Sequence, residues 1–447
     1  MTPDRGFHLT AVLTAVRWNE LRLLLVSVAL LVVGLLSTSI AVKPDHLLDL
    51  VSLRPAIAPA FLLVCLTVVW AASGMAASEL ILPTIAMLLC TGLVLIERLQ
   101  VDIGPPGTAL AGLSGRHQLY VGLAIGTLFT TGRWFPFWKA TRRYKYLVMT
   151  GSLLLMLVTL VFGTERYGAK LWLEVGPLSI QTSEIIKLGL VLFLAAYLHE
   201  KGDLLGATWH VGPLSLPPVP TLIPLLGVLA ISVGLVVVLD DLGTALLLFG
   251  ITLTMFYVAT GNGWYVGVGL FAFAACSWFA YQRFGRVGIR VANWLDPWSD
   301  PFVGGYQQIQ SDYALAAGGL LGTGLGRGQP EAIPAVHTDF VLSALMEETG
   351  FVGVSAVVAC NIILLLLGLR IALSTPILYE RLLGVGLATT LGLQAVIITG
   401  GVLRVIPLTG VTLPFVSAGG SSLIANAVAA GMLINLSHRV ARRETVL

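Results

Sequence analysis

Residues 133–163 read RWFPFWKATRRYKYLVMTGSLLLMLVTLVFG, a cluster of basic residues followed by an apolar run. The run is close to the length of about 20 apolar residues that a helix needs to cross the hydrocarbon core of a bilayer. The basic cluster contains no acidic residue and consists of Arg133, Lys139, Arg142, Arg143 and Lys145. Because basic loops stay on the cytoplasmic side, the stretch predicts a membrane span that begins at the cytoplasmic surface.

The whole chain has the same apolar character. Hydrophobic residues make up 56% of its 447 residues, charged residues only 11%, and the mean hydropathy is +0.90. So few charges cannot form the water-facing surface of a soluble globule. We therefore expect an all-α polytopic membrane protein with about twelve transmembrane helices, at 20–42, 57–75, 80–97, 118–137, 145–163, 182–199, 219–239, 242–260, 264–281, 339–371, 382–403 and 411–437.

The basic residues also predict the orientation of the chain. The C-terminal tail carries Arg439, Arg442 and Arg443, so it belongs with the cytoplasmic cluster at 133–145. With an even number of helices, both termini are then cytoplasmic. The long segment from Gln282 to Thr338 falls on the extracytoplasmic side.

Composition and spacing exclude several classes of function. The net charge is only +3 and the basic residues gather in loops, which indicates membrane topology and no nucleic-acid partner. The cysteines lie in apolar runs without CxxC spacing, so neither a disulfide framework nor a zinc site is expected. The glycines of the outer loop include GxGxG spacing, but no strand precedes them. We expect sharp turns or close backbone approach there, at Gly318, Gly319, Gly322, Gly324, Gly326 and Gly328.

The outer loop concentrates ionisable residues in a protein that otherwise almost excludes them. Its sequence from 291 to 340 is VANWLDPWSDPFVGGYQQIQSDYALAAGGLLGTGLGRGQPEAIPAVHTDF. Asp300 lies between two prolines and beside Trp298 and Phe302, and a partly desolvated carboxylate held in this way is suited to act as a general base. It is equally an aspartate that forms a turn by bonding its own backbone, and Asp296 has the same two interpretations.

A run of arginines precedes this loop on a short, amphipathic segment that could lie along the membrane face. Arg283, Arg286 and Arg290 could chelate the oxygens of a diphosphate head group. They could instead contact anionic lipid head groups. Three basic residues on the outer side oppose the usual charge bias, which favours a compensating anionic substrate.

Polar residues inside the apolar runs offer further candidates. Glu184 and Lys187 share one face of a helix, and such an intramembrane ion pair is either functional or a lock between two helices. Asp241 is placed to cap the next helix. Ser421 and Ser422 lie in a helix start expected after Pro414, where the helix N-terminus could face a phosphate or small residues could allow close packing.

Six segments, in this order and spacing, resemble the shape, elongation, division and sporulation (SEDS) family, which includes RodA and FtsW. They are GAKLW (168–172), QTSEIIKL (181–188), DLGTA (241–245), DPWSDPFVGGYQQIQS (296–311), HTDF (337–340) and PLTGVTLPFVSAGGSS (407–422). The resemblance covers about residues 80 to 440. It implies a ten-helix core at 79–440 with a large extracytoplasmic loop at 282–338, an additional two-helix segment at 1–78, and a cytoplasmic tail at 441–447.

The resemblance also implies an activity. Members polymerise lipid II into peptidoglycan strands with undecaprenyl diphosphate as the leaving group, in the bacterial plasma membrane and beside a class B penicillin-binding protein transpeptidase. The family's catalytic aspartate falls on Asp300, which would deprotonate the 4-hydroxyl of the acceptor sugar. Arg283, Arg286 and Arg290 would stabilise the negative charge of the diphosphate. Mg²⁺ or Mn²⁺ is a further candidate for this role, although the sequence shows no dedicated set of metal ligands. The remaining substrate-binding candidates are Glu184, Lys187, Gln307, Ser311, His337, Ser421 and Ser422.

Five positions depart from the family pattern. The residues that stand in place of two prolines, an asparagine, a small residue and a tyrosine are Thr182, Asp240, Ile398, Arg404 and Ala418. These changes leave open a specialised paralogue, a flippase for lipid-linked precursors, or a non-catalytic scaffold for a transpeptidase. The segment SELILPTIAMLLCTGLVLIERL (78–99) is more similar to RodA than to FtsW. The sequence does not decide between elongation and division.

Overall fold

The computed structural model describes residues 17–42, 53–104, 108, 110–134, 138–166, 169–176, 178–206, 209–211, 214–216 and 219–444. Parts of four expected segments lie outside these residues: positions 1–16 and 43–52 of the N-terminal segment, 135–137 of the expected span 118–137, Gly168 of the GAKLW motif, and 445–447 of the tail. Up to Glu444 the expected tail continues the last helix.

Each of the twelve expected spans overlaps a helix. These helices are α2 (Trp18–Val42), α3 (Arg54–Ala72), α4 (Ile81–Ile103), α5 (Leu113–Trp134), α7 (Lys145–Phe162), α8 (Thr182–Gly206), α9 (Val219–Val238), α10 (Leu242–Thr260), α11 (Gly263–Arg283), α14 (Val341–Ser374), α15 (Leu378–Val402) and α16 (Gly420–Glu444). Shorter helices are α6 (Trp138–Arg143), α12 (Gly285–Leu295), α13 (Tyr306–Gly318), η2 (Pro297–Ser299) and η3 (Pro330–Ala332).

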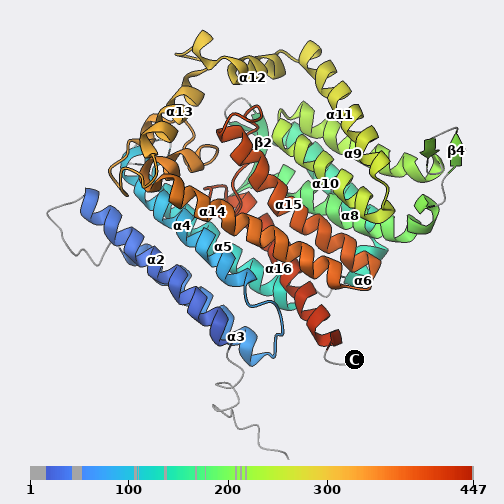
Figure 1. The fold of residues 1–447 in the computed structure, drawn as a ribbon, viewed down its shortest axis with the longest axis horizontal. Helices are drawn as coiled ribbons and strands as arrows, with labels where there is room; N and C mark the ends of the chain where they lie inside the picture. Colours follow the sequence, from blue (N-terminus) through green and yellow to red (C-terminus); the bar gives the residue numbers. More distant parts are fainter. Residues whose placement is uncertain are drawn as a thin grey trace, which may run out of the picture.

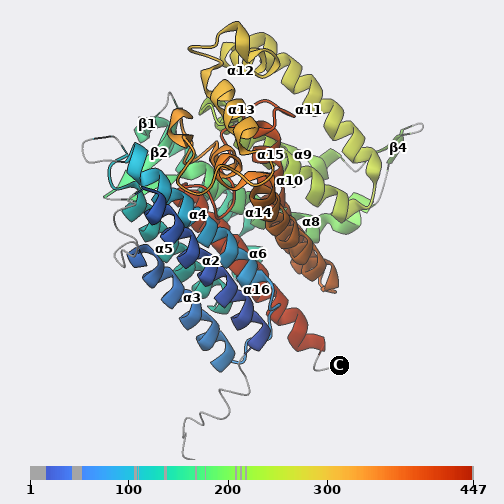
Figure 2. The same ribbon diagram turned by 60° about the vertical axis from the view of Figure 1, so that its left-hand side comes forward.

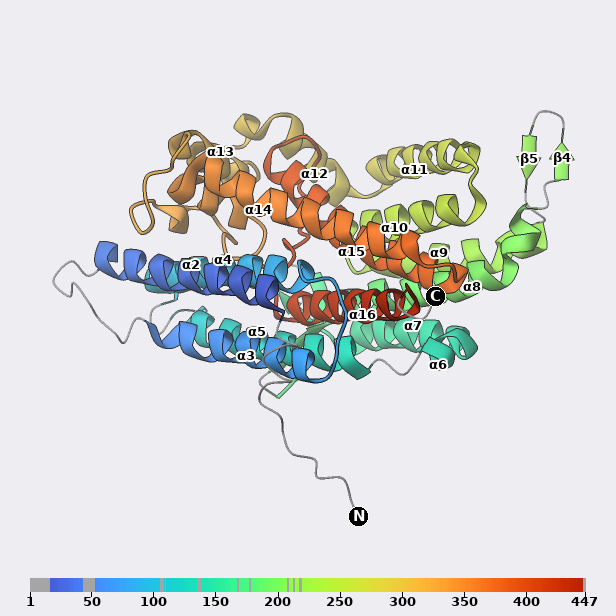
Figure 3. The same ribbon diagram turned by 60° about the horizontal axis from the view of Figure 1, so that its bottom comes forward.

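Ten of the described helices are long and apolar enough to cross a membrane. The two others among the expected twelve are α5, which carries Arg116 and Arg133, and α9, whose apolar part is the shorter stretch Leu222–Val238. The predicted class, an all-α polytopic membrane protein, is confirmed. In the bundle, α15 packs against α8, α10, α14 and α16, while α5 lies along α16 and α2 along α4 (Figures 1 and 3).

The basic segments meet at one end of the bundle. The Thr141 hydroxyl of α6 is 2.9 Å from the Tyr379 hydroxyl at the start of α15, and Glu380 forms ion pairs with Arg439 and Arg443 of α16. Helices α12 and α13 lie at the opposite end (Figure 1). The basic segments and the long loop are therefore separated by the bundle, and which end faces the cytoplasm stays a prediction.

A small sheet lies between α7 and α8, where the sequence analysis expected no strands. Strands β1 (Thr164–Arg166), β2 (Ala169–Val175) and β3 (Leu178–Gln181) pair antiparallel in that order. The register pairs Trp172 with Gln181, so the sheet ends directly at the first turn of α8. A second short hairpin, β4 (Trp209–Val211) and β5 (Leu214–Leu216), precedes α9.

The glycine-rich part of the outer loop packs on a kink in α14. The helix is interrupted at Gly350, whose φ of 68° and ψ of −171° are not helical. The loop supplies backbone bonds at the break: the Thr323 amide donates to the Glu347 carbonyl at 2.8 Å, and the Phe351 amide donates to the Gly319 carbonyl at 3.0 Å. A Cβ at Gly322 would overlap the Glu348 carbonyl. The prediction of close backbone approach is confirmed.

The start of the last helix was predicted too early. We expected the last span at 411–437, with a helix start after Pro414, but α16 begins only at Gly420. The preceding segment is fixed by long-range bonds that a helix would not allow. The Ser417 hydroxyl donates to the Thr338 carbonyl at 2.7 Å, and the Ala418 amide donates to the His337 carbonyl at 2.9 Å.

Candidate functional site

A cavity of about 1060 Å³ opens at the end of the bundle that carries the long loop. Its walls come from α5, β2, β3, the α9–α10 turn, α12, α13, the loop before α14 and the segment before α16. This volume is at the upper end of the range of ligand sites, which is about 300–1,000 Å³. The cavity can therefore hold a large polar head group.

The segments that carry the sequence motifs meet in this cavity. HTDF contributes all four of its residues, from His337 to Phe340. The motif PLTGVTLPFVSAGGSS contributes residues 408–410, 412 and 418–421. The motif DPWSDPFVGGYQQIQS contributes Gly304 and two glutamines of α13, and the remaining motifs contribute Trp172, Gln181 and Asp241, among others. Motifs that are far apart in the sequence thus form one site.

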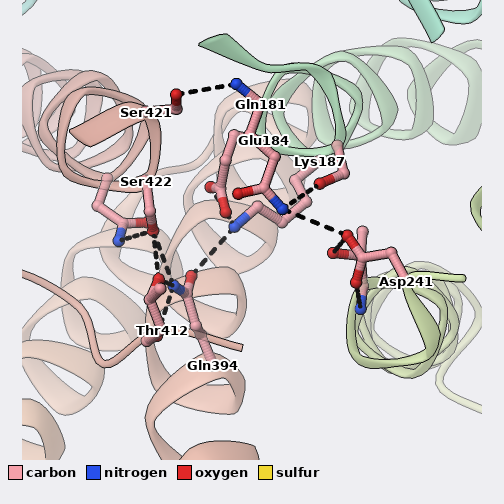
Figure 4. Close-up of polar contacts among 11 residues, drawn as sticks. Gln181, Glu184, Lys187, Asp241, Gln394, Thr412, Ser421 and Ser422 are labelled. Carbon is pink, nitrogen blue, oxygen red and sulfur yellow. Dashed lines mark hydrogen bonds and ion pairs between the residues drawn. The ribbon is translucent and has the colours of Figure 1, made fainter. Parts of the chain in front are cut away.

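Hydrogen bonds between the motifs fix one wall of the cavity (Figure 4). The Gln181 amide donates to the Ser421 hydroxyl at 2.9 Å, and this hydroxyl donates to the Ser179 carbonyl at 2.8 Å. Ser421 lines the cavity, but its hydroxyl is already hydrogen-bonded to strand β3. Ser422 is buried and bonds the Thr412 hydroxyl at 2.8 Å, and it does not line the cavity.

The predicted ion pair of α8 lies behind this wall. Glu184 and Lys187 pair on one face of the helix and are only 6% and 2% exposed. Lys187 also donates to the Gln394 side chain of α15 at 3.3 Å, and Gln394 donates to the Thr412 carbonyl at 2.8 Å (Figure 4). Neither charged residue lines the cavity. The contacts fit the interpretation of a lock between α8 and α15.

Asp300 lies at the rim of the cavity and outside its lining. Its Oδ2 accepts a hydrogen bond from the amide of Gly304, a lining residue, at 2.9 Å. The carboxylate is exposed, because Trp298 and Phe302 are themselves 53% and 87% exposed and do not cover it. The expected desolvation by aromatic neighbours is therefore wrong, and the turn geometry is present. Its Oδ1 has no hydrogen-bond partner among the described residues and is available to a hydroxyl.

The three arginines do not share one site. They lie on or next to α12, which is amphipathic as expected and has no buried residue. Only Arg290 lines the cavity, where its buried Nη1 has no hydrogen-bond partner in the described part of the chain. Arg286 pairs with Asp240, and Arg283 lies over the Phe279 ring with its guanidinium carbon 5.7 Å from the ring centroid.

Among the other predicted residues, two line the cavity and one does not. His337 is 7% exposed, and burial together with the nearby Arg116 lowers its pKa to about 4, so the imidazole is neutral at physiological pH. Gln307 lines the cavity and donates to the Pro334 carbonyl at 2.8 Å. Ser311 is buried against Ser343, 2.7 Å away, and does not reach the cavity.

The sequence analysis missed several polar residues of the cavity, among them Arg116, His117 and Asp339. Arg116 and His117 lie on α5, and the Nε2 atom of His117 is buried without a hydrogen-bond partner among the described residues. Asp339 was noted only as one residue of the HTDF motif. Burial raises its pKa to about 6 and outweighs the opposing effects of a Thr338 hydrogen bond and of Arg290. The adjacent basic residues Arg116 and His117, at the start of an apolar run, could have marked α5 as part of a site.

The cavity offers little to a divalent cation. In the part of the chain that the structure describes, no three His, Cys, Asp or Glu residues come together as metal ligands. The Asp241 carboxylate, which lines the cavity, already accepts from the Thr244 amide at 2.9 Å and from its hydroxyl at 2.8 Å. We therefore assign no step to Mg²⁺ or Mn²⁺, and their requirement stays a prediction that chelation with EDTA tests.

Comparisons with known proteins agree on one family. The sequence model of the FtsW/RodA/SpoVE family, described as cell cycle protein, matches residues 57–442. The chain is 39% identical to the peptidoglycan glycosyltransferase RodA of Mycobacterium tuberculosis strain H37Rv, over 81% of this chain and 78% of the relative. It is 34% identical to stage V sporulation protein E of Bacillus subtilis, over 72% and 86%.

Solved structures give the same result. A chain of a peptidoglycan synthase complex that coordinates polymerization and crosslinking superposes with a TM-score of 0.67 at 29% identity, covering 82% of this chain and 98% of that one. The rod shape determining protein RodA of Thermus thermophilus superposes with a TM-score of 0.58 at 28% identity, covering 81% and 97%.

Proposed function

We propose that this chain, which belongs to the FtsW/RodA/SpoVE family of cell cycle proteins and is a peptidoglycan glycosyltransferase of the membrane, polymerises lipid II in the cavity described above. The observation that carries the proposal is the meeting of the motif segments around one cavity of about 1060 Å³. A cavity at one end of a bundle of membrane-spanning helices suits a substrate with a lipid tail and a large polar head.

Asp300 would act on the acceptor sugar, and Arg290 would act on the leaving diphosphate of the donor. The free Oδ1 of Asp300 takes the proton of the acceptor sugar's 4-hydroxyl, whose oxygen forms a bond to the donor's anomeric carbon. The bond from that carbon to the diphosphate oxygen breaks, and undecaprenyl diphosphate leaves with the electron pair. Arg290, whose Nη1 has no hydrogen-bond partner among the described residues, supports the developing negative charge.

We also propose that the site lies outside the cytoplasm. The basic segments lie at the end of the bundle opposite α12 and α13, which supports cytoplasmic termini and an extracytoplasmic cavity in a bacterial plasma membrane (Figure 1). We also propose a class B penicillin-binding protein as partner, because a similar chain belongs to a synthase complex that polymerises and crosslinks. Similarity to RodA supports a role in cell shape over division.

The test is polymerisation of fluorescent lipid II by the purified protein, alone and with its transpeptidase. Wild type is expected to form glycan chains. Ala418→Trp, which fills the cavity from its wall, should reduce the rate at least tenfold, while Ala332→Trp, in the same outer region and outside the lining, should not. Translocation of lipid II without chain formation would support the flippase alternative. Neither activity under any pairing would support the scaffold alternative.

A further inference from the structure

We propose that Asp240 and Arg404 are positioning residues that hold α12 over the cavity and thereby keep Arg290 inside it. Only the effect on activity rests on the proposed function, because the position of α12 can be measured without a substrate. Both are positions at which the chain departs from its family's pattern. The departures then have a structural role and do not simply mark a loss of activity.

Helix α12 cannot be held by burial. It spans the end of the bundle between α11 and α13 (Figure 2), and none of its eleven residues is buried. Yet it supplies three residues to the cavity lining, Arg290, Asn293 and Trp294. Because an exposed helix gains little from apolar packing, its position must depend on polar contacts at its ends.

The first contact joins the N-terminal turn of α12 to the turn between α9 and α10. Arg286 forms an ion pair with Asp240. Asp240 has a φ of 65°, and its neighbour Asp241 caps α10 by accepting from the Thr244 amide. Both partners are substantially exposed, so the ion pair alone is a weak restraint.

The second contact joins the C-terminal end of α12 to the turn after α15. The Trp294 indole nitrogen donates to the Arg404 carbonyl at 2.8 Å, and the Arg404 guanidinium donates back to the Trp294 carbonyl at 3.0 Å. The same guanidinium pairs with Asp312 of α13 at 3.2 Å. One arginine thus fixes both α12 and α13 to the body of the bundle.

Both anchoring residues have a backbone conformation that non-glycine residues rarely adopt. Asp240 and Arg404 are two of four non-glycine residues with positive φ in the described part of the chain, with values of 65° and 55°. Such strain persists where surrounding contacts determine the conformation, and it gathers at functional sites. We infer that the unusual backbone conformation of these two turns directs the side chains of Asp240 and Arg404 to α12.

The test combines a distance with kinetics. Spin labels at Ile289→Cys on α12 and Val396→Cys on α15, both exposed positions, report the separation of α12 from the body once the four native cysteines are replaced. Arg404→Gly removes the guanidinium and suits the positive φ, and Asp240→Asn removes the charge and tolerates the same φ. Neither variant therefore needs to misfold. Arg370→Ala changes an exposed arginine near the C-terminal end of α14, far in the sequence from both turns, and is the control.

The distance distribution should broaden and lengthen in Arg404→Gly, less so in Asp240→Asn, and stay unchanged in Arg370→Ala. The kcat for lipid II should fall about tenfold in Arg404→Gly with KM within about twofold, as expected when a group is displaced from the transition state. An unchanged distance in both variants overturns the proposal. So does a lengthened distance with an unaltered kcat. If wild type makes no glycan chains, the proposed function fails, and the distance alone decides whether the two residues position α12.

Discussion

Asp339 and Arg290 carry opposite charges within the same cavity and influence one another. Arg290 opposes the upward shift of the Asp339 pKa, and burial outweighs it, so the carboxyl has a pKa of about 6. It is ionised above that pH and neutral below it. The net charge that an anionic head group meets in the cavity therefore changes near pH 6.

We expect the affinity for lipid II to fall as pH rises through 6, because ionised Asp339 then repels the diphosphate. One unit charge several ångströms away is worth roughly 1 kcal/mol, or about fivefold in affinity. Binding of fluorescent lipid II, measured between pH 5 and 7.5, reports this change in affinity. Asp339→Asn should bind at every pH as wild type does at pH 5. A step that persists in this variant would assign the titration to another group; His337, with a pKa of about 4, stays neutral over the range.

At this scale the sequence located some site residues and misjudged others. His337, Arg290 and Gln307 were found because their motif or charge set them apart, and all three line the cavity. The environment of Asp300 was not predictable, because neighbouring aromatic residues in the sequence do not reveal which way they face. Asp339 was missed as a separate candidate because its unusual pKa arises from burial by distant segments.

Among the elements, α8 contacts α15 through its buried pair of Glu184 and Lys187, because Lys187 also donates to Gln394 of α15. Lys187→Met leaves Glu184 charged and unpaired inside the bundle, which should destabilise the protein by about 3–5 kcal/mol. The midpoint of thermal unfolding in detergent reports the loss. Lys201→Met, on the same helix at a side chain that is 36% exposed, should change it little.

The double variant Glu184→Gln with Lys187→Met separates structure from function. Without an unpaired charge it should recover most of the stability. If the pair is a lock between helices, the double variant also recovers polymerisation. A stable double variant without activity would contradict the structural interpretation.

The kink of α14 makes a matched pair of glycines informative. Gly322→Ala places a methyl group on the Glu348 carbonyl at a φ of 80°, whereas Gly319→Ala, at a φ of 52°, meets no atom within 4 Å. Strain costs each variant about 1–3 kcal/mol, and the overlap adds a similar amount to Gly322→Ala alone. Thermal unfolding should rank Gly322→Ala clearly below Gly319→Ala, and equal midpoints would argue against this packing of the loop.

Elements were predictable where apolar length alone determines them. All twelve expected spans overlap helices because lipid requires backbone groups to bond within the segment. Strands β1 to β3 were missed because their sheet packs on helices, β2 against α7 and α8 and β3 against α16, which is distant in the sequence. The early start assigned to α16 has a related cause, since bonds from Ser417 and Ala418 to residues before α14 replace the helical ones.

For the whole molecule, we predict that the end of the bundle with α12 and α13 faces the outside of the cell. A cysteine at Phe302, an exposed residue of the outer loop, should react with an impermeant maleimide in intact cells, in a background without the native cysteines. A cysteine at Tyr144, exposed beside the basic segment, should react only after the membrane is opened. The reverse pattern would place the cavity in the cytoplasm, where the extracytoplasmic assembly of glycan strands could not use it.

The central claim is that Asp300, at the rim of this cavity, is the base that joins lipid II units. Its most direct test is polymerisation by Asp300→Asn beside Asp296→Asn, because each aspartate caps a turn through one oxygen, bonding the Gly304 and Trp298 amides respectively. We predict that Asp300→Asn loses at least about a hundredfold in kcat, in keeping with general base catalysis, while Asp296→Asn stays within a few-fold of wild type. Equal losses in the two variants, or full activity in Asp300→Asn, would contradict the account.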